Sequence, residues 1–197
     1  GWDILSRAGD ISITTNGYAN WNTSRQRNLG AKVGSDVLSS SANISVTVNG
    51  MYDNTANANS RLSTSGAVRF MPHGANYALD YQIGFEVEAG SFEFGKIANV
   101  NSSTTDLTIV RDLTSREAIT ISATTLFVTP GADLVATQAG ESVFMKLRSD
   151  VFSDNGSSTT DAGHSRVQTN NGEIVFWVDS DGNSTGGIAL GSYFQVN

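Results

Sequence analysis

The sequence contains no cysteine and unusually little charge for its length. Its 197 residues include 2 prolines and 16% charged residues, whereas soluble domains usually carry about 25% charged residues. Without cysteine the chain has no disulfide bonds, no thiolate metal sites and no thiol nucleophile. The scarcity of charged helix formers, together with 20 glycines, excludes a coiled coil.

Two further absences narrow the class of protein. No apolar run approaches the ~18 residues of a membrane-spanning helix, so we expect no membrane insertion. The formal net charge of -7 argues against nucleic acid or an anionic membrane as a partner. The opening residues 1–3 show neither the basic nor the apolar part of a leader, so we expect a processed or an excised chain.

Alternation of apolar and polar residues with a period of two runs through the chain, which is typical of half-buried strands. The longest β segment is expected over residues 77–94, and Asn49-Gly50 predicts a hairpin. Other strands are expected at residues 10–14, 42–48, 67–71, 105–110, 118–128, 142–147, 172–178 and 188–196. Short strands separated by Gly, Asn, Asp and Ser predict an all-β fold, specifically an antiparallel β-sandwich of the jelly-roll kind.

The organisation predicted from the chain is a single domain over residues 1–197. Residues 1–40 are expected to pack separately or against a partner. No repeat of fixed length is visible. Polar stretches at 54–65, 99–105 and 154–171 are expected to be loops, and residues 131–139 are expected to form a short helical turn.

No group of residues in the sequence indicates catalysis. The two histidines, His73 and His164, stand in polar segments, and no Gly-x-Ser-x-Gly motif is present. Glu86 and Glu88 lie on one side of a predicted strand at a spacing that a glycosidase could use. The outward polar face of a half-buried strand is the interpretation that we favour for this pair, so we predict that the protein is not an enzyme.

A candidate calcium loop lies near the end of the chain. Asp179, Asp181 and Asn183 place side-chain oxygens at alternate positions around Gly182, which suits a hard cation on a tightly curved backbone. The twelfth position of such a loop is Leu190 instead of the usual Glu. The alternative is a plain β-turn. Calcium is the one cofactor that the sequence suggests, and the other expectation is no cofactor at all.

Aromatic residues outside the clear strands are candidate ligand-binding residues, because aromatic rings stack on the apolar faces of sugars. Tyr18 and Trp21 lie in the polar N-terminal segment, and Tyr52 and Tyr77 lie near the ends of predicted strands. Packing within the chain or across a subunit interface is the alternative role. Trp177, within an apolar run, is expected in the core.

The composition, rich in Ser, Thr, Asn and Gly and free of cysteine, resembles that of the head domains of phage tail fibres and virion spikes. The resemblance implies a non-enzymatic attachment protein on a virion or cell surface, commonly trimeric, whose loops recognise a glycan or a surface receptor. Trimerisation would also cover exposed sheet edges.

Two other functions remain open. The chain could be a filament-forming subunit, pilin-like or matrix-like, that donates residues 10–14 as a strand to a neighbour. It could also be a secreted, calcium-dependent carbohydrate-binding module. In all three cases we expect an extracellular or virion-surface location.

Overall fold

The computed structural model describes residues 3–6, 9–20, 36–39, 41–52, 61–74, 80–95, 106–153, 164–191 and 194–197. This part of the chain contains 22 β-strands and no helix, and every strand belongs to one of three sheets. Each pair of neighbouring strands within a sheet runs parallel, as the register of Ile44 on Ile11 and of Val68 on Ile44 illustrates.

The strands of each sheet, given in the order in which they are hydrogen-bonded, come from every third strand of the chain. The first sheet contains β1 (Asp3–Ser6), β4 (Asp36–Ser39), β7 (Arg61–Ser63), β10 (Glu86–Ala89), β13 (Leu113–Ser115), β16 (Asp133–Ala139), β19 (Ser165–Asn170) and β22 (Phe194–Val196). The second contains β2 (Ile11–Thr14), β5 (Ile44–Val48), β8 (Ala67–Pro72), β11 (Ser91–Phe94), β14 (Ile119–Ala123), β17 (Val143–Leu147) and β20 (Ile174–Trp177). The third contains β3 (Tyr18–Asn20), β6 (Gly50–Tyr52), β9 (Tyr81–Ile83), β12 (Leu107–Ile109), β15 (Leu126–Val128), β18 (Val151–Ser153) and β21 (Ile188–Ala189).

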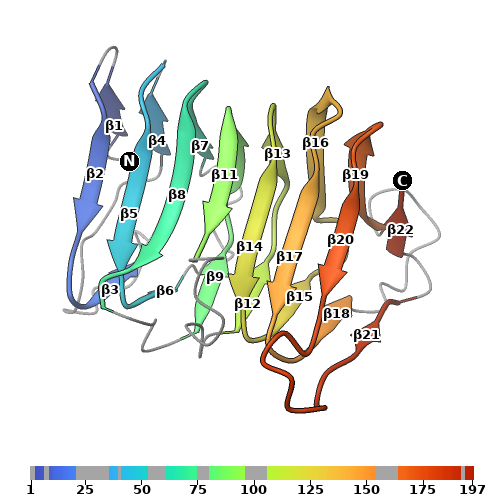
Figure 1. Ribbon diagram of the computed structural model, residues 1–197. Helices are drawn as coiled ribbons and strands as arrows, with labels where there is room; N and C mark the ends of the chain where they lie inside the picture. Colours follow the sequence, from blue (N-terminus) through green and yellow to red (C-terminus); the bar gives the residue numbers. More distant parts are fainter. Residues whose placement is uncertain are drawn as a thin grey trace.

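This topology is that of a parallel β-helix. The chain passes through one strand of each sheet in turn and then begins the next coil, which we call a rung. Successive rungs stack from β1 at one end to β22 at the other, as Figure 1 shows from blue to red. Hydrogen bonds therefore run along the stack, between strands that are far apart in the sequence.

The prediction of an antiparallel jelly-roll sandwich is wrong. Asn49-Gly50 does not close a hairpin, because β5 and β6 belong to different sheets and pair with other rungs. The segment 77–94, expected as the longest β segment, contains β9, β10 and β11, one in each sheet. Alternation reports that one side of a strand is buried, but it carries no information about the direction of the neighbouring strand.

Several segments without clear alternation are also strands. Residues 133–139, within the expected helical turn, form β16, while β7 and β19 lie within expected loops. Both β7 and β16 have a parallel neighbour on each side. These neighbours supply the ladder hydrogen bonds that a single short strand cannot make alone.

The core is a column of stacked apolar side chains inside the coil. One register position is occupied, rung after rung, by Ile4, Val37, Leu62, Val87, Leu113, Leu134, Val167 and Val196. Leu62, Leu113 and Leu134 are fully buried. Aliphatic residues at matching positions allow each rung to cover the apolar surface of the next.

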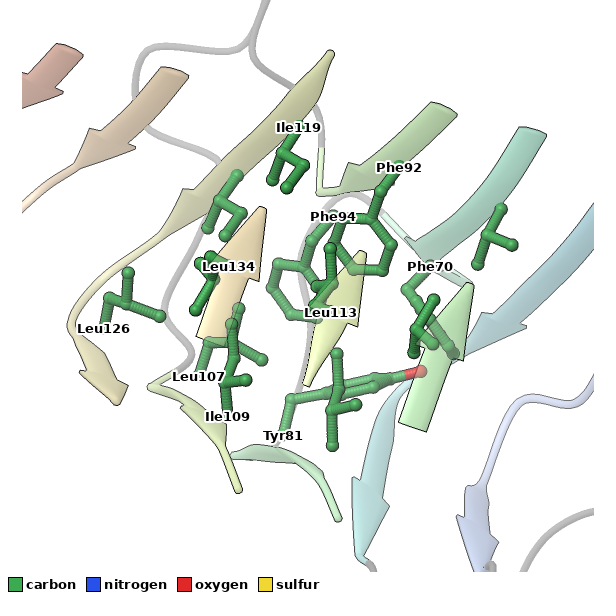
Figure 2. Packing of buried hydrophobic residues seen from close by; sticks show 14 of the residues in the cluster. Phe70, Tyr81, Phe92, Phe94, Leu107, Ile109, Leu113, Ile119, Leu126 and Leu134 are labelled. Carbon is green, nitrogen blue, oxygen red and sulfur yellow. The ribbon is translucent and has the colours of Figure 1, made fainter. Parts of the chain in front are cut away.

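Aromatic rings pack against one another in part of this core (Figure 2). The ring of Phe70 lies 5.7 Å from that of Tyr81 and 5.8 Å from that of Phe92, and Tyr81 meets Phe94 edge to face at 5.0 Å. All four residues are at most 1% exposed. Such pairs add stability beyond the burial of their area.

Tight corners between the first and second sheets keep the rungs in register. Asn43 donates its backbone N–H to Oδ1 of Asp10 at 2.9 Å, and its own Oδ1 accepts the N–H of Ala67 at 3.0 Å. At the same corner a Cβ added to Gly90 would lie 2.1 Å from the carbonyl oxygen of Ser65. Glycine is thus required where one rung's backbone approaches the next.

The last rung leaves its inward side chains exposed. Ile188 and Val196 occupy core register positions, opposite Val151 and Val167, yet they are 49% and 46% exposed. By contrast, Val151 and Val167 are fully buried. Among the described strands, β21 and β22 each have a neighbour on one side only, so their inward residues are covered from that side alone.

Candidate functional site

A hollow of about 340 Å³ lies at the corner between the second and third sheets, near the last rungs. Three successive rungs form it: Thr124 follows β14, Arg148 and Ser149 follow β17, and the segment after β20 contributes the rest. In Figure 1 this last segment loops outward before the chain enters β21. The lining residues are Thr124, Arg148, Ser149, Asp181, Asn183 and Thr185.

An ion pair between two rungs forms the wall of this hollow. Nε and Nη2 of Arg148 both lie 3.1 Å from Oδ2 of Asp181, and the side-chain amide of Asn183 donates to the same oxygen at 3.0 Å. Oδ1 of Asp181 has no hydrogen-bond partner among the described residues, although the side chain is only 9% exposed. One carboxylate oxygen thus has three donors and the other has none.

The loop that carries Asp181 is held by its own side chains. The carboxylate of Asp179 accepts the backbone N–H of Ser184 at 3.1 Å. The amide oxygen of Asn183 accepts the N–H of Thr185 at 2.8 Å. Asp179 and Ser184 both have positive φ angles, 51° and 63°, which these hydrogen bonds stabilise.

The predicted calcium ligands have separate tasks in this loop. Asp179 accepts the backbone N–H of Ser184, and Asp181 pairs with Arg148. Asn183 donates to Asp181 through its side-chain amide and accepts the backbone N–H of Thr185. Within the described ranges no three or more Asp, Glu or His side chains gather as a metal site. Calcium binding stays a prediction, and its test is given in the Discussion.

Trp177 lies on the outer face of the second sheet, with 47% of its surface exposed. Its ring covers the ammonium group of Lys146, whose Nζ lies 4.9 Å from the ring centroid, and meets Phe144 edge to face at 6.4 Å. The prediction that Trp177 belongs to the core is wrong. Ile174 and Phe176 are the residues of β20 that pack against the core, so their neighbour Trp177 faces outward.

Of the four aromatic candidates, the structure gives only the backbone of two. Tyr18 lies in β3 and Tyr52 in β6. Their side chains, and all of Trp21 and Tyr77, lie outside the described residues. The aromatic residue that sequence reasoning missed is Trp177, which an apolar run concealed.

The carboxylates that suggested a glycosidase lie on an outer face, and one of them, Glu88, contacts the neighbouring rung. Glu86 and Glu88 are both exposed on β10. Glu88 lies 3.5 Å from Nη2 of Arg61 and accepts the hydroxyl of Ser63 at 3.2 Å. Asp133 and Arg166 form a similar pair at 2.7 Å. These acids hold neighbouring coils together.

Comparisons with protein-family models, curated proteins and solved structures found no match to this chain. The described residues include no helical segment long and apolar enough to cross a bilayer. The features of this chain that bear on its function are therefore the β-helix and the geometry of the hollow.

Proposed function

We propose that this chain is a non-enzymatic structural and attachment module, exposed on a virion or cell surface, that recognises a glycan or receptor through the side of a rigid β-helix. One observation carries the proposal: three parallel sheets run without a break through the described rungs. At about 4.8 Å per rung, the eight strands of the first sheet span about 34 Å. A rod of this kind suits a spacer that holds a binding surface away from the virion or cell that carries it.

The outer surface supports attachment better than catalysis. Outward positions carry Ser, Thr and Asn, and acids such as Glu88, Glu93 and Asp133 are engaged in ion pairs with the adjacent rung. A surface built from hydroxyl and amide groups can bind hydroxyl-rich ligands by shape and hydrogen bonding.

The attachment proposal is tested with fluorescently labelled protein on a panel of intact bacterial and animal cells. We expect saturable binding to at least one cell type, and competition by unlabelled protein. Periodate oxidation of surface glycans and protease treatment of surface proteins then separate a glycan ligand from a protein receptor. Absence of saturable binding across the panel would refute attachment.

A filament-forming subunit is the second candidate, favoured by the exposed apolar side chains of Ile188 and Val196. An uncovered strand edge is a template for pairing with another chain, and a head-to-tail contact that does not close generates a filament. Residues 11–14, within the segment expected to be donated, already pair with β5 as β2. We therefore propose stacking of whole ends between copies instead of strand donation.

Light scattering over a range of concentrations tests this second candidate. End stacking predicts a mass that rises with concentration, and predicts that Ile188→Lys with Val196→Lys abolishes the rise. The surface change Gln82→Lys in β9 serves as the control. A concentration-independent monomer or trimer would exclude filament formation.

A further inference from the structure

We propose that the hollow beside Asp181 binds a neutral sugar, with Trp177 as the ring on which the sugar stacks. This inference rests on the proposed attachment function, and it names the ligand class and the residues that bind it. The calcium hypothesis contained Asp181 and Asn183 but neither Arg148 nor Trp177, because these parts of the site come from different rungs.

The first argument is the unbalanced carboxylate of Asp181. Its Oδ2 is contacted by Nε and Nη2 of Arg148 and accepts a hydrogen bond from the side-chain amide of Asn183. Its Oδ1 has no hydrogen-bond partner among the described residues. A buried polar atom without a hydrogen bond is costly and rare in folded proteins. Because Oδ1 is enclosed in this structure, a sugar hydroxyl would reach it only after the carboxylate of Asp181 turned toward the hollow. Sugar hydroxyls are suitable, because they donate to a carboxylate and accept from a guanidinium.

The second argument is charge. Arg148 and Asp181 cancel one another, and the side chain of Arg148 remains 31% exposed. Asp150, which accepts the hydroxyl of Ser149 at 2.6 Å, and Asp179 are within two residues of the lining in the sequence and add two negative charges, while Lys146 against the indole of Trp177 adds one positive charge. The whole chain carries -7. The net negative charge of these groups and of the whole chain would repel an acidic sugar. We therefore infer that the ligand is neutral and rich in hydroxyl groups.

The third argument is the exposed indole close to the hollow. Trp177 is paired in register with Lys146, and Arg148 follows Lys146 by two residues, about 7 Å along an extended chain. The indole therefore lies beside the hollow, although Trp177 is not among the residues that line it. An exposed ring beside hydroxyl, amide and charged groups offers an apolar face and hydrogen bonds to one ligand.

The size of the hollow sets the size of the ligand. A volume of about 340 Å³ lies at the small end of the range for small-molecule sites. We therefore infer that one or two sugar rings occupy it, as the terminal residues of a longer glycan.

The experiment uses the full chain on an array of neutral glycans that end in glucose, galactose, mannose or N-acetylglucosamine, beside their sialylated counterparts. Titration calorimetry with the best neutral glycan then compares Trp177→Ala and Asp181→Asn with wild type. Phe127→Ala removes an outward aromatic ring on another sheet, and Asp133→Asn removes another inter-rung ion pair. These two changes are the matched controls.

We expect wild type to bind a neutral glycan, with Trp177→Ala and Asp181→Asn roughly tenfold or more weaker, the loss typical of an energetically important contact. Both controls should bind within about twofold of wild type. Thermal melting confirms that each variant folds, and Trp177→Ala tests the site even if Asp181→Asn disturbs the loop.

The outcomes separate this site from the attachment function. If wild type binds but both site variants bind as tightly as their controls, the site is wrong while attachment stands. A preference for sialylated glycans overturns the neutral ligand class. If no neutral glycan on the array is bound, the sugar site is wrong, and attachment is judged by the cell-binding measurement alone.

Discussion

Substituting Gly90 by alanine tests the parallel stacking of rungs directly. A Cβ at this position would lie 2.1 Å from the carbonyl oxygen of Ser65 and 2.8 Å from that of Gly66, both in the preceding rung. Ordinary contacts begin near 3.4 Å, so the two rungs must separate locally by more than 1 Å. Backbone carbonyls in a ladder cannot swing aside as the end of a flexible side chain can.

The cost follows from the hydrogen bonds at this corner. Gly90 donates to the carbonyl of Gly66 at 2.7 Å, and its own carbonyl accepts from Glu117 at 2.7 Å. Weakening both costs about 1–3 kcal/mol in total, and the overpacking strain adds about 1–3 kcal/mol. Alanine also lowers the conformational entropy of the unfolded chain, which offsets about 0.4–1 kcal/mol of the loss in stability. We therefore expect a net destabilisation of about 1–5.5 kcal/mol.

Gly9→Ala is the matched control, because Gly9 holds the same place in the first rung, two residues before the strand. A Cβ there would meet only Oγ of Ser6, at 3.7 Å. Its predicted effect is neutral or a gain of about 0.4–1 kcal/mol. Urea and thermal unfolding, followed by circular dichroism, measure both variants. Equal stability of Gly90→Ala and Gly9→Ala would refute the stacked-rung corner.

Phe70→Ala, which empties a fully buried site, should destabilise the protein by about 3–5 kcal/mol, whereas Phe127→Ala, at a site 36% exposed, should cost far less; similar melting temperatures would contradict the aromatic core. Arg166→Gln removes an ion pair whose arginine is 48% exposed, so urea unfolding should show a loss of at most about 1 kcal/mol that shrinks with added salt. Calcium bound by Asp179, Asp181 and Asn183 should stabilise the folded protein, so its removal with a chelator should lower the melting temperature; an unchanged melting temperature would exclude the calcium site.

The repeat that defines the fold is present in the sequence but has no fixed period. Five consecutive positions repeat where the chain enters the second sheet. The first is a small or acidic residue and the second varies; the third and fifth are apolar, and the fourth faces outward. This pattern covers residues 9–13, 42–46, 66–70, 90–94, 117–121, 141–145 and 172–176, as the strand register aligns them. The spacing varies because connections of different length leave the coil, so a search for a constant period misses it.

The residues that line the hollow also differ in how readily the sequence reveals them. Asp181 and Asn183 attract notice in the sequence because they flank Gly182 in a short polar motif. Arg148 does not, since it stands 33 residues earlier and no local pattern joins it to Asp181. Only the stacking of β20 on β17 brings the guanidinium to the carboxylate.

Sequence alone determined that the chain is all-β, that residues such as Ile44, Val46 and Phe70 are buried, and that loops rich in Asn, Asp and Gly separate the strands. These properties depend on near neighbours, whose alternation and turn chemistry are readable locally. Tertiary structure decided that the strands run parallel, that Trp177 faces outward and that Arg148 meets Asp181. The reason is physical: in a β-helix each ladder joins residues a full coil apart, so the pairing energy lies in contacts that no local pattern encodes.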